Sequence, residues 1–111
     1  MIANTPEPPY YAVIFSSART EVINGYSEMA EKMVELASSQ EGFLGLESAR
    51  EELGITVSYW IDLDAIQRWK ENSEHSLARE KGRKDWYSAF KVRIAKIERD
   101  YEFSKSINDN P

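Results

Sequence analysis

The residues best suited to chemistry are concentrated in the second half of this chain. All three tryptophans and the single histidine lie within 27 consecutive positions of 111. Aromatic rings combine a large apolar surface with a polar edge, so a cluster of them either shares a core or lines a pocket. Because a small domain rarely needs three indoles for packing alone, the sequence predicts a cavity for a flat, partly polar ligand. The cluster comprises Ser58, Tyr59, Trp60, Trp69, Asn72, His75, Trp86 and Tyr87.

The composition argues against several other kinds of site. The sequence has no cysteine and one histidine, which excludes disulfides, thiolate chemistry and a multi-histidine metal site within one chain. The net charge of −5 argues against a nucleic-acid partner, because phosphate binding needs a positive surface. Residues 1–9 lack the pattern of a secretory signal, and no apolar run reaches 18 residues. We therefore expect a cytoplasmic protein that does not enter a membrane.

The charges are unevenly distributed along the chain. Residues 21–52 hold eight acidic and two basic side chains, whereas residues 79–99 hold eight basic and three acidic ones. This pattern fits two solvated faces of opposite sign. It also fits a basic rim that guides an anionic small molecule, or charge complementarity within a dimer.

Hydrophobic periodicity predicts the elements that must position these residues. Residues 10–17 (YYAVIFSS) indicate a strand, and the apolar stripe from Tyr26 to Ala37 indicates a helix with Asn24 as its N-cap. Residues 43–61 predict a β-hairpin. Asp62 or Asp64 is expected to cap the next helix, which a second helical piece continues over residues 73–82.

A last strand is predicted over residues 90–103, and its apolar residues change phase. Phe90, Val92 and Ile94 share one parity, while Tyr101 and Phe103 share the other, together with Ile97. Strict alternation cannot bury both sets, so we expect a bulge or a change of partner near Ala95.

The order β-α-β-β-α-(α)-β predicts an α+β, ferredoxin-like split β-α-β antiparallel sheet with helices on one face. The opposite face would then expose apolar side chains, which usually marks an interface. We expect a homodimer that packs sheet against sheet as a dimeric α/β barrel. The domain should span residues 10–103, between an N-terminal extension (residues 1–9) and a flexible C-terminal tail (residues 104–111).

Over residues 10–103 the chain resembles the antibiotic-biosynthesis monooxygenase family of the dimeric α/β-barrel superfamily, in its bacterial single-domain branch. The resemblance is carried by PPYYAVIFSS (8–17), EGFLGLESAR (41–50), GITVSYW (54–60) and AIQRW (65–69), and by the later pattern of Asn72, His75, Ala78, Gly82, Trp86, Tyr87 and ERDYEF. It implies a monooxygenase that uses no metal, flavin or haem and oxidises a small aromatic or polycyclic phenol or quinol with O₂.

Such chemistry requires a held ring, a stabilised anion and a proton transfer at neutral pH. The resemblance therefore implies that Asn72 binds a phenolate or carbonyl oxygen, that His75 moves the proton, and that Arg93 supplies positive charge. The residues expected to hold the ring are Trp60, Trp69, Trp86 and Tyr87.

Each candidate also has a structural interpretation. Trp69 lies on the apolar face of its helix and fits core packing, as do Trp60 and the Trp86–Tyr87 pair. Asn72 could end a helix, His75 could be a hydrogen-bonded structural residue, and Arg93 could be solvated or form a dimer salt bridge. The alternative function is therefore a non-catalytic dimer that binds a small aromatic metabolite.

Haem binding or degradation, known in another branch of the superfamily, is disfavoured. That branch pairs an asparagine on the first strand with a histidine about ten residues after the helix tryptophan. Here the first strand contains no asparagine, and the tenth position after Trp69 is Arg79.

Overall fold

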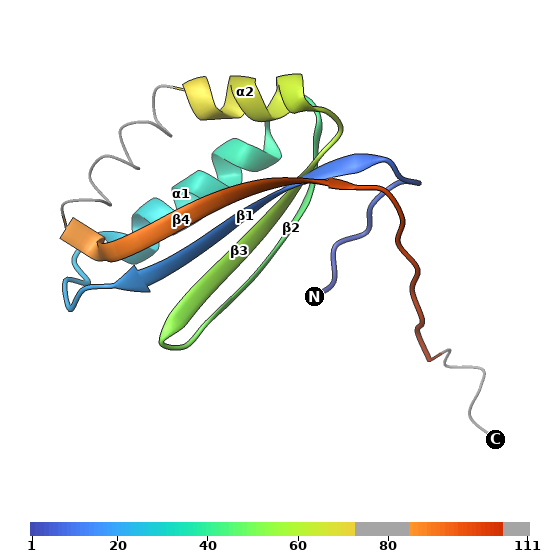
Figure 1. Cartoon of the computed structure of the whole chain (residues 1–111). Helices are drawn as coiled ribbons and strands as arrows, with labels where there is room; N and C mark the ends of the chain where they lie inside the picture. The colour runs from blue at the N-terminus through green and yellow to red at the C-terminus, as the bar shows by residue number, and fades with distance from the viewer. Residues whose placement is uncertain (73–84, 106–111) are drawn as a thin grey trace.

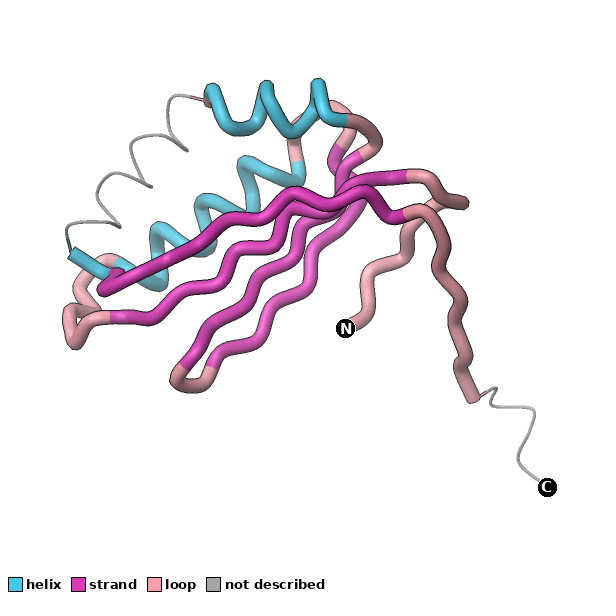
Figure 2. The backbone as a smooth tube through the Cα atoms, in the orientation of Figure 1, coloured by secondary structure: helices cyan, strands magenta, loops and turns pink. Residues whose placement is uncertain are grey.

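Strands and helices follow the order β-α-β-β-α-β over the part that the computed structural model describes, residues 1–72 and 85–105 (Figure 1). Neighbouring strands run antiparallel in the sheet order β2-β3-β1-β4, and both helices cover one face (Figure 2). This is the predicted α+β, ferredoxin-like arrangement. The elements are β1 (Tyr10–Arg19), α1 (Tyr26–Ser38), β2 (Phe43–Arg50), β3 (Leu53–Trp60), α2 (Leu63–Glu71) and β4 (Tyr87–Ile97).

Strand register assigns each side chain to one of the two faces of the sheet. Val13 lies between Ser58 of β3 and Ile94 of β4, on the side that packs against the helices. We call this side the helix face, and the side that carries Ala12 the outer face, because side chains alternate along a strand. Every residue of β1 is buried or half-buried, as its near-continuous apolar sequence predicts.

Trp60 is the centre of the core between the sheet and the helices. Its side chain is 0% exposed, stacks on Trp69 with ring centroids 6.0 Å apart, and meets the Phe43 ring edge-on at 5.4 Å. Its indole N–H donates to the Ser58 hydroxyl at 2.9 Å, so the one polar atom of the ring has a partner. The remaining buried members of this core are Ala37, Ala65 and Ile66.

The two helices begin in different ways. The Asp62 carboxylate accepts a hydrogen bond from the Ala65 N–H at 2.8 Å, which confirms one of the two predicted caps of α2. The prediction that Asn24 caps α1 is wrong. Gly25 occupies the N-cap position with a φ of 78° and no side-chain hydrogen bond, a left-handed backbone that glycine adopts without a steric penalty.

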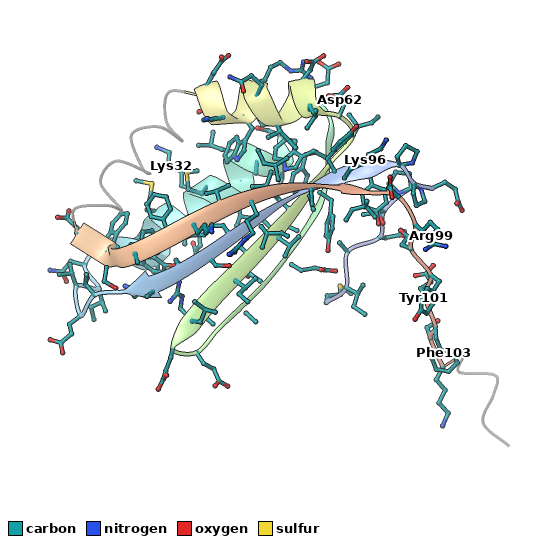
Figure 3. The ribbon with its side chains drawn as sticks, in the orientation of Figure 1. Lys32, Asp62, Lys96, Arg99, Tyr101 and Phe103 are labelled. Atoms are coloured by element: carbon teal, nitrogen blue, oxygen red, sulfur yellow. The ribbon has the colours of Figure 1, made fainter. Side chains whose placement is uncertain are left out.

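The predicted last strand ends earlier than its apolar residues indicated. The β1–β4 register is unbroken from Tyr10–Ile97 to Ala18–Ala89, so the bulge predicted near Ala95 is wrong. The shift occurs at the other end, where Arg19 pairs with Tyr87. Tyr101 and Phe103 lie beyond β4, are 98% and 87% exposed, and extend away from the sheet (Figure 3). The phase conflict disappears because they do not belong to the strand.

Residues at the N-terminus lie against the outer face of the sheet (Figure 1). The Ala3 N–H donates to the Glu47 carboxylate at 2.8 Å, and the Tyr59 hydroxyl donates to the same carboxylate at 2.7 Å. The Ala3 and Tyr59 hydrogen bonds lower the pKa of Glu47. Burial, and then the bond to Glu47, raises the pKa of Tyr59 to about 12.

These two shifts predict a stability contribution that is lost at both extremes of pH. Replacing Tyr59 with phenylalanine should cost about 1 kcal/mol at pH 7 through the lost hydrogen bond. The difference in the free energy of unfolding between the variant and wild type should shrink as pH rises from 10 towards 12. A phenol whose pKa is raised in the folded state contributes its full stability only below that range. The difference should also shrink below pH 4.5, where Glu47 becomes protonated. Urea unfolding of both proteins at stepped pH measures this. A difference that stays constant with pH would contradict the proposed linkage.

Candidate functional site

A cavity of about 740 Å³ lies between the helix face of the sheet and the two helices. Ligand pockets in proteins typically have volumes of about 300–1,000 Å³ and mostly apolar walls, so this one has the size and lining for a small aromatic molecule. The lining residues are Val13, Phe15, Tyr26, Met29, Ala30, Met33, Val34, Ala37, Leu46, Ser48, Thr56, Ser58, Ile66, Trp69, Lys70, Trp86, Tyr87, Phe90, Val92 and Ile94.

The cavity exists because the described helices cover only part of the helix face. Helix α1 packs against β2 and α2 packs against β3, on one half of the sheet. On the other half, Val92 and Ile94 of β4 point to the helix side and stay 43% and 54% exposed. Apolar side chains left open on a concave surface favour the binding of an apolar ligand.

Three of the residues predicted to hold an aromatic ring line this cavity: Trp69, Trp86 and Tyr87. Trp69 has both of the roles considered for it, since its ring also stacks on Trp60 in the core. Trp60 is not among the lining residues. It is enclosed by the core, where the strand register places it between Tyr11 and Phe43.

The remaining predicted residues are placed differently. Asn72 follows the last residue of α2 as its C-cap, where its N–H donates to the Trp69 carbonyl at 3.1 Å, and it is not among the residues that line the cavity. Arg93 pairs with Ile14, so it points to the outer face and away from the cavity. His75 lies outside the described residues, as does the second helical piece predicted over residues 73–82.

A cluster of aromatic rings, which was not predicted as a group from the sequence, forms one end of the cavity. The Tyr87 ring meets Phe15 edge-on at 5.4 Å and Tyr26 at 6.1 Å, and Phe90 packs on both Phe15 and Tyr87. Trp86 meets Tyr26 edge-on at 5.7 Å. Such edge-to-face pairs stabilise a rigid wall beyond the effect of area burial. The sequence assigned Tyr26 only to the apolar stripe of α1. Its ring contacts residues about 60 positions away, and such contacts leave no local pattern in the sequence.

The same end of the cavity brings two tyrosine hydroxyls together. The Tyr87 hydroxyl lies 3.4 Å from the Tyr26 hydroxyl, at the long limit of a hydrogen bond. Burial and the Tyr26 hydroxyl raise the pKa of Tyr87, while the charges of Arg50 and Arg19 act in the opposite direction. The Tyr87 hydroxyl is therefore a neutral donor at pH 7.

The described residues contain no group of three or more histidine, aspartate or glutamate side chains placed to hold a metal ion. Within the same ranges, no helix has the length and apolarity needed to cross a bilayer. The cavity is lined by aromatic rings and by side chains that can form hydrogen bonds. The polar side chains on its wall are Tyr26, Ser48, Thr56, Ser58, Lys70 and Tyr87.

Solved structures of other proteins share this fold. SnoaB, a cofactor-independent oxygenase from Streptomyces nogalater, aligns with a TM-score of 0.67 at 10% identity, over 92% of this chain and 100% of SnoaB. A conserved protein from Methanosarcina mazei Go1 aligns with a TM-score of 0.70 at 11% identity, over 78% of this chain and 91% of that protein. At these identities the likeness concerns the fold alone.

Sequence comparison establishes the relationship itself. The uncharacterised protein YqjZ of Bacillus subtilis (strain 168) is 54% identical over 110 residues, which cover 97% of this chain and 96% of YqjZ. The antibiotic biosynthesis monooxygenase family model matches residues 9–81. The match covers well over half of the chain, from the start of the first strand past the second helix. The chain therefore belongs to the antibiotic biosynthesis monooxygenase family.

Proposed function

We propose that this protein is a monooxygenase that oxidises a small aromatic substrate, a phenol or quinol, with O₂ and without a metal or organic cofactor. The observation that carries the proposal is the 740 Å³ apolar cavity with Trp69, Trp86 and Tyr87 on its wall. Family membership and the shared fold of SnoaB, itself a cofactor-independent oxygenase, support it. A fold alone hosts many functions, so the site carries more of the argument than the fold.

The proposed chemistry begins when the substrate loses a proton and becomes an electron-rich anion. That anion transfers electrons to O₂, one oxygen atom bonds to a ring carbon, and the other leaves as water with two hydrogens of the substrate, one from its hydroxyl and one from that carbon. The protein holds the ring flat against the aromatic wall and excludes water from it. His75 is the proposed proton acceptor, because its unperturbed pKa suits proton transfer near neutral pH.

Oxygen uptake by metal-stripped protein should exceed the uncatalysed rate for at least one compound in a panel of anthrones, quinols and polycyclic phenols. Replacing His75 with alanine should lower turnover by about 10²-fold or more, the usual contribution of general acid–base catalysis.

Replacing Ala30, which lines the cavity, with tryptophan should lower kcat/KM by about tenfold or more, since the indole would occupy ligand space. An oxygen electrode measures both effects.

The matched control for the filled cavity is Glu31→Trp, which adds the same ring to an exposed position one residue further along α1. It should leave kcat/KM within twofold of wild type. If no compound is oxidised but cavity ligands still bind and Ala30→Trp blocks them, the protein is a non-catalytic binding module. Equal loss of activity in the Ala30 and Glu31 variants would exclude the cavity as the site.

We also propose that two copies of the chain pair through the outer face of the sheet. Leu53 and Ile55 of β3 are 55% and 40% exposed there, beside Ala18 and Ser16 of β1. Tyr101 and Phe103 continue beyond β4 with almost no contact to their own chain. Association of two such faces would bury these apolar side chains and satisfy two-fold symmetry.

A further inference from the structure

Two arginines lie beside the aromatic end of the cavity. The end of β1, the end of β2 and the starts of α1 and β4 all lie at one end of the molecule (Figure 1). Arg19 and Arg50 come from the first two of these and are half-buried. Neither forms an ion pair with any of the residues that the structure describes. A half-buried, unpaired guanidinium is unusual in a chain of net charge −5, because burial of charge is unfavourable without a counter-charge.

Arg50 lies on the helix face, where a glycine in β3 leaves space for its guanidinium. Its guanidinium crosses β3 over Gly54 and donates to the hydroxyl of Ser17, which is buried in β1. A Cβ atom at position 54 would collide with that guanidinium, so only glycine leaves the path open. Ser17 pairs with Phe90, a member of the aromatic wall, and this register brings the charge next to the cavity end.

Arg19 approaches the same place from the other side. Its guanidinium carbon lies 3.5 Å from the centre of the Tyr26 ring, a cation–π contact, and one of its terminal nitrogens donates to the Val22 carbonyl at 3.0 Å. Its Nε atom is buried and has no hydrogen-bond partner among the described residues. Buried donors are normally satisfied, so an unpartnered one packed against Tyr26, a lining residue of the cavity, favours an acceptor atom from a ligand.

We propose that the Tyr26 and Tyr87 hydroxyls, with Arg19 and Arg50 behind them, form a binding site for an anionic oxygen of the aromatic ligand. Tyr26 and Tyr87 both line the cavity, and their hydroxyls, 3.4 Å apart, can donate to one oxygen atom placed between them. The two guanidiniums supply the compensating positive charge. The ligand class is therefore an aromatic compound with a phenolate, enolate, carboxylate or sulfonate group at one end. The inference rests on the proposed function only in taking the cavity as the ligand site.

Two dyes that differ by a single anionic group test this site without any need for turnover. The dyes are 8-anilinonaphthalene-1-sulfonate and N-phenyl-1-naphthylamine, which has the same aromatic skeleton without the sulfonate. Fluorescence titration should show that Arg50→Met and the double variant Tyr26→Phe/Tyr87→Phe each weaken sulfonate-dye binding about tenfold or more. Binding of the neutral dye should stay within twofold of wild type.

The matched control is Arg93→Met, which removes the same unit of charge from the outer face of the sheet. It should leave the affinity for both dyes within twofold. Gly54→Ala provides a second test, because it displaces the Arg50 guanidinium while keeping its charge. It should weaken the binding of the sulfonate dye and leave that of the neutral dye unchanged. Circular dichroism confirms that each variant is folded.

Three results would overturn the anion site. The first is an equal loss of affinity for both dyes in the Arg50 and tyrosine variants. The second is an equal loss of affinity for the sulfonate dye in the Arg50 and Arg93 variants. The third is no loss of affinity in any variant. Failure of the oxygenase proposal has a different signature. In that case the charge-selective dye pattern persists, while no compound of the oxygen-uptake panel is oxidised.

Discussion

Replacing Trp60 with alanine should lower the free energy of unfolding by about 3–5 kcal/mol, the usual cost of emptying a buried aromatic site. The Trp60 side chain is wholly buried, and Trp69 and Phe43 pack against its two-ring surface. Truncation would leave a void. It would also remove the indole N–H that donates to the Ser58 hydroxyl. Urea unfolding followed by circular dichroism measures the loss.

Tyr101→Ala is the control for that experiment, since it removes a similarly large ring from a position that is 98% exposed. Its effect should stay within about 0.5 kcal/mol, as for other surface substitutions. A loss below about 1 kcal/mol for Trp60→Ala would show that the ring does not support the core. Trp60→Phe, which keeps part of the volume, should fold and retain cavity binding, because the residue does not line the cavity.

Replacing Ile55 with aspartate should dissociate the proposed dimer. Ile55 pairs with Ser16 and lies on the outer face, where we place the interface. Burying an unpaired carboxylate there costs several kcal/mol, so the dimer dissociation constant should rise by at least about 10²-fold. Analytical ultracentrifugation should find wild type at about twice the chain mass of 12.8 kDa and the variant at the chain mass.

Val92→Asp is the matched control, because Val92 is as exposed as Ile55 but lies on the helix face of β4. It should reduce ligand binding in the cavity and leave the dimer intact. A wild-type protein that sediments as a monomer at micromolar concentration would exclude the interface. A dimer that survives Ile55→Asp and dissociates with Val92→Asp would place the interface on the opposite face of the sheet.

Local patterns predicted most of the fold because they follow from short-range geometry. The near-continuous apolar run of residues 10–17 and the hairpin over residues 43–61 become β1, β2 and β3, and the stripe from Tyr26 to Ala37 becomes α1. Asp62 caps α2 because its carboxylate needs only an N–H three residues away. The last strand was predicted too long, because exposed Tyr101 and Phe103 have the same residue types as a buried strand.

The candidate site was predicted only in part, since its residues meet through strand register. The sequence indicated that aromatic residues would share a pocket, and Trp69, Trp86 and Tyr87 do line it. It could not separate them from Trp60, whose burial depends on which strands flank it. Arg93 was expected at the cavity, but its place opposite Ile14 directs it to the outer face.

The order of the elements and the apolar face of each follow from the chain alone, because these depend on neighbours a few residues apart. The folded chain alone brings Arg19, Tyr26 and Tyr87 together, although 68 positions separate the first from the last. It also brings Arg50 to Ser17 across Gly54. Those contacts depend on the pairing of β1 with β3 and β4, and side chains brought together by such long-range pairing leave no periodic signal in the chain.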